Sequence, residues 1–397
     1  MDGGRLRQTI HLIGGGVIVI TGDSGRMLEF LWFVGYCEEF PSQLALRVGG
    51  HPEWNRHVKY TAIKKGYVEV FRGTYMQRVI RSLRLTEAGL EYICSKDPGS
   101  AAYILAKDNA GISTNNRLRS ILRLHAVATG LVMAHNAGAL VLAHQKPSLM
   151  FDSLTDPNRI PVDPQAIYYY SANEIRTAIQ EFEPDSVAKT SRIIGIMVHG
   201  SLCFCLYYSG RSRMYWQRTN EENTVAAIDA LLSARGFRCS SYSQVIIASQ
   251  QKLAITISKQ KVNGLSRYFT VSTSYNNCYF VENSFRGDWL LKLLIQPRMQ
   301  AQLNRKLLEN YSSNDTNARG YAAVTKDGLR PVVLAYPFDL LELMNLSPVP
   351  EGFHYSPILL CFDYQADTIQ SIVGPKFEVR PCTGGTQIEQ EDIWKDP

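Results

Sequence analysis

Three helix signals follow one another near the start of this 397-residue chain, and their order restricts the fold more than any other feature. The first helix is predicted from Ser24, a good N-cap residue, to Tyr36, with apolar residues at helical spacing. A short helix over Gln43–Val48 follows it. The third begins at Pro52, whose missing N–H is not needed in a first turn, and ends at Gly66, a residue type that commonly follows a helix.

Two strand signals and a further helix complete this segment. Tyr67–Arg72 alternates apolar and polar residues, Tyr75–Leu85 contains the second strand, and Gly73-Thr74 is the predicted turn between them. Thr86 is a good N-cap for the helix that follows. Helix, helix, helix, strand, strand, helix within residues 24–95 is the order of a winged helix-turn-helix domain.

The positive charge of the chain is confined to the same segment. The formal net charge is +6, from 42 basic and 36 acidic residues. Between His51 and Arg84 there are eight basic residues, opposed only by Glu53 and Glu69, so this window holds the entire excess. An excess confined to one helix and one hairpin is typical of a surface that binds nucleic acid. Taken alone, the helix is also compatible with a solvated amphipathic helix that has no partner.

The third helix is predicted to have one apolar and one basic face. Trp54, Val58 and Ala62 recur at i+4 and i+8, which places them on the inner side. The other side offers cations for phosphates, and amide and guanidinium groups for base edges. The predicted DNA-binding residues are Asn55, Arg56, His57, Lys59, Tyr60, Lys64, Lys65, Arg72, Arg78, Arg81 and Arg84.

The rest of the chain adds a connector and a larger domain. The predicted fold class is α+β, with a winged helix-turn-helix at residues 24–95, a helical connector at 96–160, a mixed α/β domain at 166–380 and a flexible tail at 383–397. Strand and helix signals alternate in the third part, and a degenerate nuclease-like fold is among the folds that match such a pattern. Four prolines within residues 146–165 indicate a linker.

Targeting and redox signals point to a cytoplasmic protein. The start of the chain has no basic and apolar leader. Ala126–Ala143 is apolar but contains His135 and Asn136, so we expect a buried helix there and no membrane contact. The eight cysteines include no Cys-x-x-Cys pair, which favours a reduced protein without a zinc ribbon. His125, His135 and His144 lack the i, i+4 spacing of a helical metal site.

Several short motifs resemble two families. The segments after the third helix and after the hairpin resemble the winged-helix domains of bacterial regulators. Together with motifs further along, they are similar to the replication-relaxation family of plasmids and integrative conjugative elements. These motifs are Lys64–Val68, Leu85–Leu90, Ser191–Gly195, Tyr207-Tyr208, Trp216, Glu221-Glu222, Phe280–Asn283 and Cys361–Gln365.

The second resemblance implies a sequence-specific DNA-binding accessory protein of a bacterial mobile element, active in its replication, relaxation or mobilisation. Its partners would be double-stranded DNA, together with a second copy of the chain as a homodimer or with relaxosome and replication proteins. The C-terminal domain would then mediate these protein contacts.

Signals for an enzyme are incomplete. A metal-dependent nuclease needs an acidic pair and a nearby lysine on adjoining strands. Asp185 precedes the predicted strand pair at residues 191–209, but that pair holds no acidic residue. Glu174 lies on a predicted helix, and Glu221 and Glu222 have no lysine two residues further on. We therefore predict no catalytic residue, no metal and no cofactor. A DNA nuclease with an unusual metal site, a transcriptional regulator and a protein scaffold are the alternatives.

Overall fold

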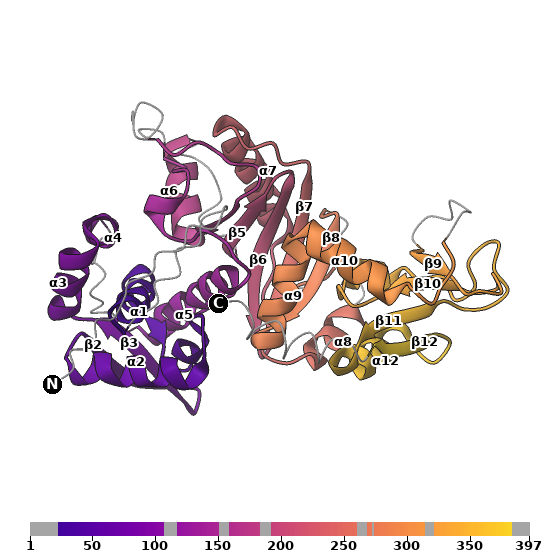
Figure 1. Ribbon diagram of the computed structural model, residues 1–397, viewed down its shortest axis with the longest axis horizontal. Helices are drawn as coiled ribbons and strands as arrows, with labels where there is room; N and C mark the ends of the chain where they lie inside the picture. Colours follow the sequence, from indigo (N-terminus) through magenta and orange to yellow (C-terminus); the bar gives the residue numbers. More distant parts are fainter. Residues whose placement is uncertain are drawn as a thin grey trace, which may run out of the picture.

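The computed structural model describes residues 23–106, 117–150, 159–182, 192–259, 268–271, 274–313 and 321–382. These residues form an α+β fold with twelve α-helices and three β-sheets, which confirms the coarse fold class. Figure 1 shows an N-terminal helical unit, a central sheet and a smaller C-terminal sheet along the longest axis of the molecule. No helix in the described ranges combines the length and apolar character needed to cross a bilayer.

The N-terminal unit follows the predicted element order closely. It contains α1 (Asp23–Cys37), β1 (Phe40–Pro41), the 3-10 helix η1 (Leu44–Arg47), α2 (Pro52–Lys64), β2 (Val68–Tyr75), β3 (Arg78–Leu85), α3 (Glu87–Lys96) and α4 (Pro98–Leu105). The three strands form one antiparallel sheet in the order β1-β3-β2. Thr86 caps α3 as predicted, because its hydroxyl accepts the N–H of Gly89 at 3.2 Å. Helix α4 was not predicted, and it occupies part of the expected connector.

The turn of the β2–β3 hairpin lies three residues beyond its predicted place. Met76 and Gln77 form it, with φ of 46° and 63°. Turns with positive φ at both central residues normally contain glycine or asparagine, and neither is present here. Gly73 lies inside β2 instead, where an added Cβ would come within 2.5 Å of Leu118 Cδ2 on the next long helix. The glycine therefore permits close packing and does not form a turn.

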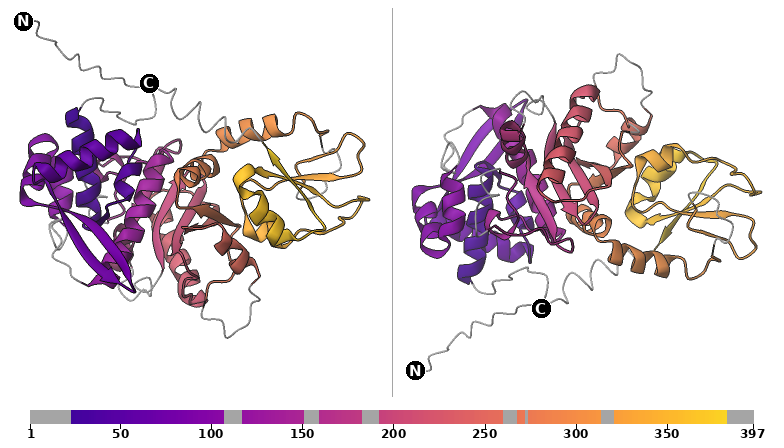
Figure 2. Two further views of the ribbon diagram at one scale, coloured as in Figure 1. Left: turned by 90° about the horizontal axis from the view of Figure 1, so that it is seen from below. Right: turned by 90° about the horizontal axis from the view of Figure 1, so that it is seen from above.

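Helix α5 (Leu118–Asn136) joins the N-terminal unit to the central sheet. It contacts β1 and β2 on one side and β4 (Ile167–Ser171), β5 (Ile193–His199) and β6 (Leu202–Gly210) on the other. Figure 2 shows it between the N-terminal helices and this sheet. Residues 126–134 are buried throughout because both sides are covered. The predicted buried helix is confirmed for that part of Ala126–Ala143.

The central sheet has five strands in the order β4-β5-β6-β7-β8. The β4–β5 and β5–β6 pairs are antiparallel, whereas β6–β7 and β7–β8 are parallel. The antiparallel β5–β6 pair matches the predicted pair at residues 191–209. The further elements here are η2 (Ala143–Gln145), α6 (Ala172–Phe182), α7 (Arg218–Ala234), β7 (Ser241–Ala248), α8 (Lys252–Ser258), β8 (Asn277–Glu282) and α9 (Phe285–Ile295).

The C-terminal part of residues 166–380 forms a second sheet, in the order β12-β11-β10-β9. Its elements are α10 (Pro297–Leu307), β9 (Ala323–Val324), β10 (Pro331–Leu334), α11 (Leu340–Met344), β11 (Ile358–Phe362), η5 (Asp363–Gln365), α12 (Ala366–Val373) and β12 (Glu378–Cys382). One apolar cluster includes residues of both sheets, and in it the rings of Phe280 and Phe338 lie 5.5 Å apart. The predicted tail at 383–397 lies outside the described residues.

Candidate nucleic-acid interface

The buried face of α2 differs from the predicted one by one residue. Val58 and Ala62 are buried as expected, but Trp54 is 44% exposed and Asn55 is only 5% exposed. The buried stripe is therefore Asn55, Val58 and Ala62, spaced i, i+3 and i+7. The prediction was wrong for Trp54, and also for Asn55, whose side chain cannot reach DNA from this position.

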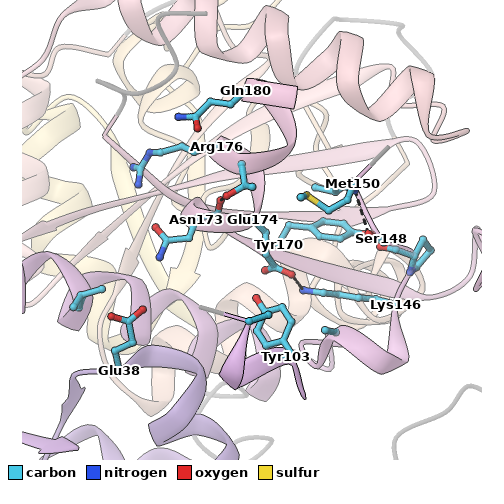
Figure 3. Close-up of a pocket in the computed structure, with 16 residues that line it drawn as sticks. Glu38, Tyr103, Lys146, Ser148, Met150, Tyr170, Asn173, Glu174, Arg176 and Gln180 are labelled. Carbon is cyan, nitrogen blue, oxygen red and sulfur yellow. Dashed lines mark hydrogen bonds and ion pairs between the residues drawn. The ribbon is translucent and has the colours of Figure 1, made fainter. Parts of the chain in front are cut away.

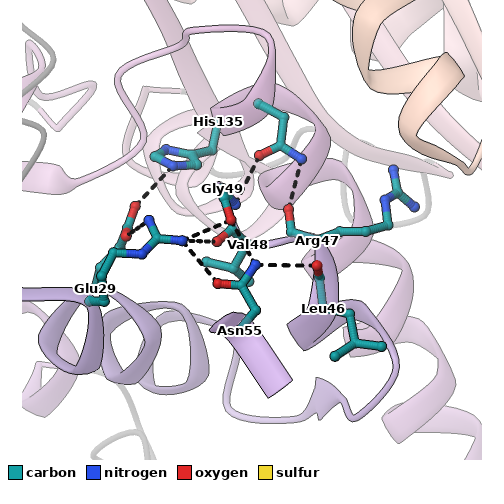
Figure 4. Close-up of polar contacts among 9 residues, drawn as sticks. Glu29, Leu46, Arg47, Val48, Gly49, Asn55 and His135 are labelled. Carbon is teal, nitrogen blue, oxygen red and sulfur yellow. Dashed lines mark hydrogen bonds and ion pairs between the residues drawn. The ribbon is translucent and has the colours of Figure 1, made fainter. Parts of the chain in front are cut away.

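Asn55 is buried because its amide closes the turn that precedes α2. Its Nδ2 donates to Gly49 O at 2.6 Å and Leu46 O at 3.2 Å, and its Oδ1 accepts from Arg26 at 2.9 Å. Arg26 also donates to Gly49 O at 2.8 Å. Figure 4 shows these groups converging on the turn, where Gly49 has a φ of 52°. The network holds α2 in a fixed orientation against α1.

A second set of contacts ties the same turn to the rest of the molecule. Asn136 of α5 donates to Arg47 O at 2.9 Å and to Asp288 Oδ2 at 2.8 Å. The Arg47 guanidinium is paired with Asp288 of α9 and also donates to Ser284 O at 3.0 Å. Because these groups are largely buried, the η1–α2 segment is held rigidly to α5 and α9.

The outer face of α2 is exposed and basic. Arg56, His57, Tyr60 and Lys64 lie on it, and Tyr60 is 64% exposed. Arg56 pairs with Glu53 at 2.7 Å, and such an exposed i,i+3 ion pair is weak in water. Four predicted residues are therefore presented together to solvent.

One face of the β2–β3 hairpin continues the basic surface of α2. Arg72 and Arg81 are direct cross-strand partners, and both are exposed. Like charges on directly opposite strand residues destabilise a hairpin, and a nearby anion would offset that effect.

Lys59 of α2 lies close to both Arg56 and Arg81. Burial and these two arginines lower the pKa of Lys59, whose ammonium also donates to Ser42 O at 3.3 Å. Lys59 thus lies where the helix and the hairpin meet.

The remaining predicted residues have different environments. Lys65 follows α2, and its ammonium lies 5.8 Å from the centre of the Tyr67 ring. Arg78 is exposed at the tip of the hairpin, opposite Tyr75. Strand alternation places Arg78 on the face that does not carry Arg81. Arg78 therefore lies on the α5 side of the hairpin.

Arg84 was wrongly predicted as a DNA contact. It is buried, and its guanidinium binds Glu39 Oε1 at 2.8 Å from Nε and 2.7 Å from Nη2. It also lies 4.0 Å from the centre of the Phe71 ring. Glu39 is fully buried, so Arg84 neutralises an internal carboxylate that would otherwise be left without a counter-charge.

A cavity of about 730 Å³ lies between α4 and α6, and Lys146 and Glu174 are among the residues that line it. Figure 3 shows Lys146 and Glu174 pointing toward each other in it. The ammonium of Lys146 lies 2.8 Å from Glu174 Oε1 and 4.7 Å from the centre of the Tyr170 ring. Glu174 Oε2 accepts the N–H of Ser171 at 2.8 Å. This carboxylate therefore caps α6 and holds a lysine, which are structural roles.

The other acidic residues considered for a nuclease also have protein partners. Glu221 is buried and accepts from Arg192 N at 2.7 Å, whereas Glu222 pairs with Arg218 at 2.7 Å. Asp185 lies outside the described residues. Among the described residues, no group of three or more His, Cys, Asp or Glu side chains is arranged to hold a metal ion.

The three histidines each have a separate partner. His125 Nε2 lies 3.0 Å from Ser82 Oγ, His135 Nε2 lies 3.1 Å from Glu29 Oε1, and His144 Nδ1 lies 3.3 Å from Ser100 Oγ. Burial lowers the pKa of His125 to about 4. His125 is therefore a neutral hydrogen-bonding link between α5 and β3 at neutral pH.

A second basic surface is formed by arginines that lie far apart in the sequence and that no local pattern predicts. Five arginines line one groove, and they come from α5, α6 and the open end of the β5–β6 pair: Arg119, Arg123, Arg176, Arg192 and Arg213. They are separated by up to 94 positions in the chain, so no window of the sequence shows them together. Residues 166–380 contain 22 basic and 18 acidic residues, and the fold brings three of these arginines together with Arg119 and Arg123 of α5.

Comparison of the chain with protein-family models, curated proteins and solved structures finds no match in any of the three.

Proposed function

We propose that this protein binds duplex DNA through α2 and the β2–β3 hairpin, which act as the recognition helix and the wing of a winged helix-turn-helix domain. The observation that carries the proposal is the continuous exposed surface formed by the outer side of α2 and one face of the hairpin. Arg56, Tyr60 and Lys64 come from the helix, and Arg72 and Arg81 come from the hairpin.

The arrangement of the N-terminal elements supports the same proposal. Helix α2 follows η1 after a tight turn, and the hairpin follows α2 directly. In helix-turn-helix proteins the second helix lies in the major groove, where arginine reads guanine and flanking cations bind phosphates. The Asn55 and Arg26 network holds α2 so that its outer side faces away from the body. The cross-strand Arg72–Arg81 pair gains stability when a phosphate binds near it.

The resemblance to the replication-relaxation family extends the proposal. On that basis the protein acts as an accessory factor in the replication, relaxation or mobilisation of a mobile element. Its central and C-terminal sheets would bind a second copy or partner proteins. Mapping the DNA sites that it selects tests this role: sites at an origin of transfer or replication support it, and sites confined to promoters favour a transcriptional regulator.

The binding proposal is tested with duplexes enriched from a random-sequence library. The dissociation constant of the best duplex is measured by fluorescence anisotropy for the wild type and for Arg56→Gln/Arg81→Gln. We expect at least about tenfold weaker binding, because one base contact and one phosphate contact are lost. The matched control is Arg305→Gln/Lys306→Gln on α10, which removes two exposed cations elsewhere. Equal affinity of both variants and the wild type would refute the proposed surface.

A further inference from the structure

The arginine-lined groove lies between α5 and the end of the central sheet where β5 begins and β6 ends, and its volume is about 750 Å³. Arg119 and Arg123 come from α5, while the other three arginines come from the opposite wall. Apolar side chains form much of the rest of the lining, among them Leu122, Val127 and Ile194. No acidic side chain is among the described residues that line the groove.

The arginines are close enough to repel one another. Burial and the nearby Arg192 lower the pKa of Arg123. Burial and Arg123 lower the pKa of Arg176 to about 10, although Glu221 acts in the opposite direction. Both guanidinium groups are still charged at neutral pH. The Glu221 carboxylate is engaged by the Arg192 N–H and by the Tyr207 hydroxyl at 3.3 Å. An anion in the groove would relieve the remaining repulsion.

Two stacked tyrosine rings, Tyr215 and Tyr268, lie beside these arginines. Tyr215 is 58% exposed, and its ring stacks on Tyr268 with centroids 5.0 Å apart. The Arg213 guanidinium lies 4.4 Å from the centre of the same Tyr268 ring. Sites for single-stranded nucleic acid combine a positively charged groove, which follows the backbone, with exposed aromatic rings on which bases stack.

We propose that this groove binds single-stranded DNA, with its arginines on the phosphates and Tyr215 under a base. A recessed channel with cations on both walls surrounds one phosphodiester chain, whereas a duplex presents its phosphates on a wide convex cylinder and suits the projecting α2 and hairpin. This is a second site, formed by other residues than the proposed duplex surface, and the proposal does not depend on duplex binding.

The groove adjoins the hairpin. Arg119 Nε donates to the hydroxyl of Tyr75, the last residue of β2, at 3.2 Å. Arg78 lies opposite Tyr75 on the same side of the hairpin. A strand that leaves a duplex held by the hairpin can therefore enter the groove past these residues.

The test measures binding of a labelled oligo(dT) of about 20 nucleotides, longer than most single-strand sites, to the full chain by anisotropy. For Arg123→Gln/Arg192→Gln we expect roughly tenfold weaker binding and a salt slope shallower by about 1.4, since two cations on a single strand are removed. Arg305→Gln/Lys306→Gln is the control and should equal the wild type. Absence of wild-type binding at moderate salt, or an unchanged groove variant with the wild-type thermal midpoint, would overturn the proposal.

A second arm separates a nucleic-acid site from a general polyanion site. Tyr215→Ala should weaken oligo(dT) binding about fivefold or more, the range of one lost base stack, and leave binding of inorganic polyphosphate unchanged. Equal losses for both ligands, or no loss for oligo(dT), would contradict the base-stacking role. Arg56→Gln/Arg81→Gln should retain oligo(dT) binding, so failure of the groove and failure of the duplex surface give different results.

Discussion

Arg119 and Tyr75 are hydrogen-bonded, with Arg119 Nε 3.2 Å from the Tyr75 hydroxyl, and this contact joins the start of the arginine-lined groove to the end of β2. The groove therefore adjoins the hairpin on the face opposite Arg72 and Arg81, so the two proposed DNA sites lie on either side of one hairpin. Adjacent sites that engage one ligand together bind it more tightly than either site does alone.

The first prediction concerns a substrate that reaches both sites. A duplex with a single-stranded dT tail should bind at least about tenfold more tightly than the blunt duplex, because the tail binds at high effective concentration. The measurement is a pair of anisotropy titrations at one salt concentration. Arg123→Gln/Arg192→Gln should bind tailed and blunt duplexes equally. A wild type that shows no preference for the tailed duplex would contradict the adjacency of the sites.

The second prediction concerns the hairpin turn. Met76 and Gln77 both have positive φ, which costs non-glycine residues roughly 1 kcal/mol each. Met76→Asn/Gln77→Gly provides residues that favour this geometry and should raise the free energy of unfolding by about 1 kcal/mol. Chemical denaturation followed by circular dichroism measures it. Thr74→Gly is a suitable comparison, since Thr74 is a strand residue and its replacement should destabilise the hairpin.

The third prediction separates structural from surface arginines. Arg84→Ala leaves the fully buried Glu39 carboxylate without its guanidinium partner and should cost about 3–5 kcal/mol of stability. Arg81→Ala, on the same strand but exposed, should change stability by less than about 0.5 kcal/mol. Replacing both members of the pair, Arg84→Met with Glu39→Leu, should recover much of the loss. Equal effects of the two single alanine variants would contradict this assignment.

The fourth prediction is a pH dependence carried by His125. Its folded pKa of about 4 lies below the ordinary value of 6.5, because burial disfavours the charged imidazole. The unfolded chain therefore binds more protons between these values, and stability falls as pH decreases from about 6.5 to 4. The effect amounts to at most roughly 3 kcal/mol. His125→Gln should flatten the unfolding free energy over that pH range, and an equally steep profile in the variant would argue against it.

The fifth prediction concerns the turn before α2. Asn55→Ala removes two donated hydrogen bonds and one accepted from Arg26, and should cost about 2–3 kcal/mol of stability. Trp54→Ala should cost less than about 1 kcal/mol, because Trp54 is largely exposed. Thermal unfolding of the two variants provides the comparison. A larger loss for Trp54 would mean that the helical face was identified wrongly here.

Local signals predicted the N-terminal elements well. Pro52 starts α2, Gly66 follows its end with φ of 71°, and Thr86 caps α3. These features depend on the backbone preferences of single residues, and those preferences follow from residue identity alone. The turn at Met76 could not be found in this way, because tertiary packing and strand register, rather than residue preference, place it there.

The sequence did not predict which polar residues are buried. Arg84 and Asn55 belong to a basic, polar pattern, and only their distant partners Glu39 and Arg26 show that they are internal. The groove was missed for a related reason. Its arginines are spread from Arg119 to Arg213, so no window of the sequence shows them together.

The most direct test of the central claim is the salt dependence of duplex binding. A plot of log K against log salt concentration has a slope of about −0.9 for each phosphate contact on B-DNA. For Arg72→Gln/Arg81→Gln we predict weaker binding and a slope shallower by about 2, with the wild-type slope retained by Arg305→Gln/Lys306→Gln. An unchanged slope in the hairpin variant would contradict the claim that α2 and the hairpin hold the DNA.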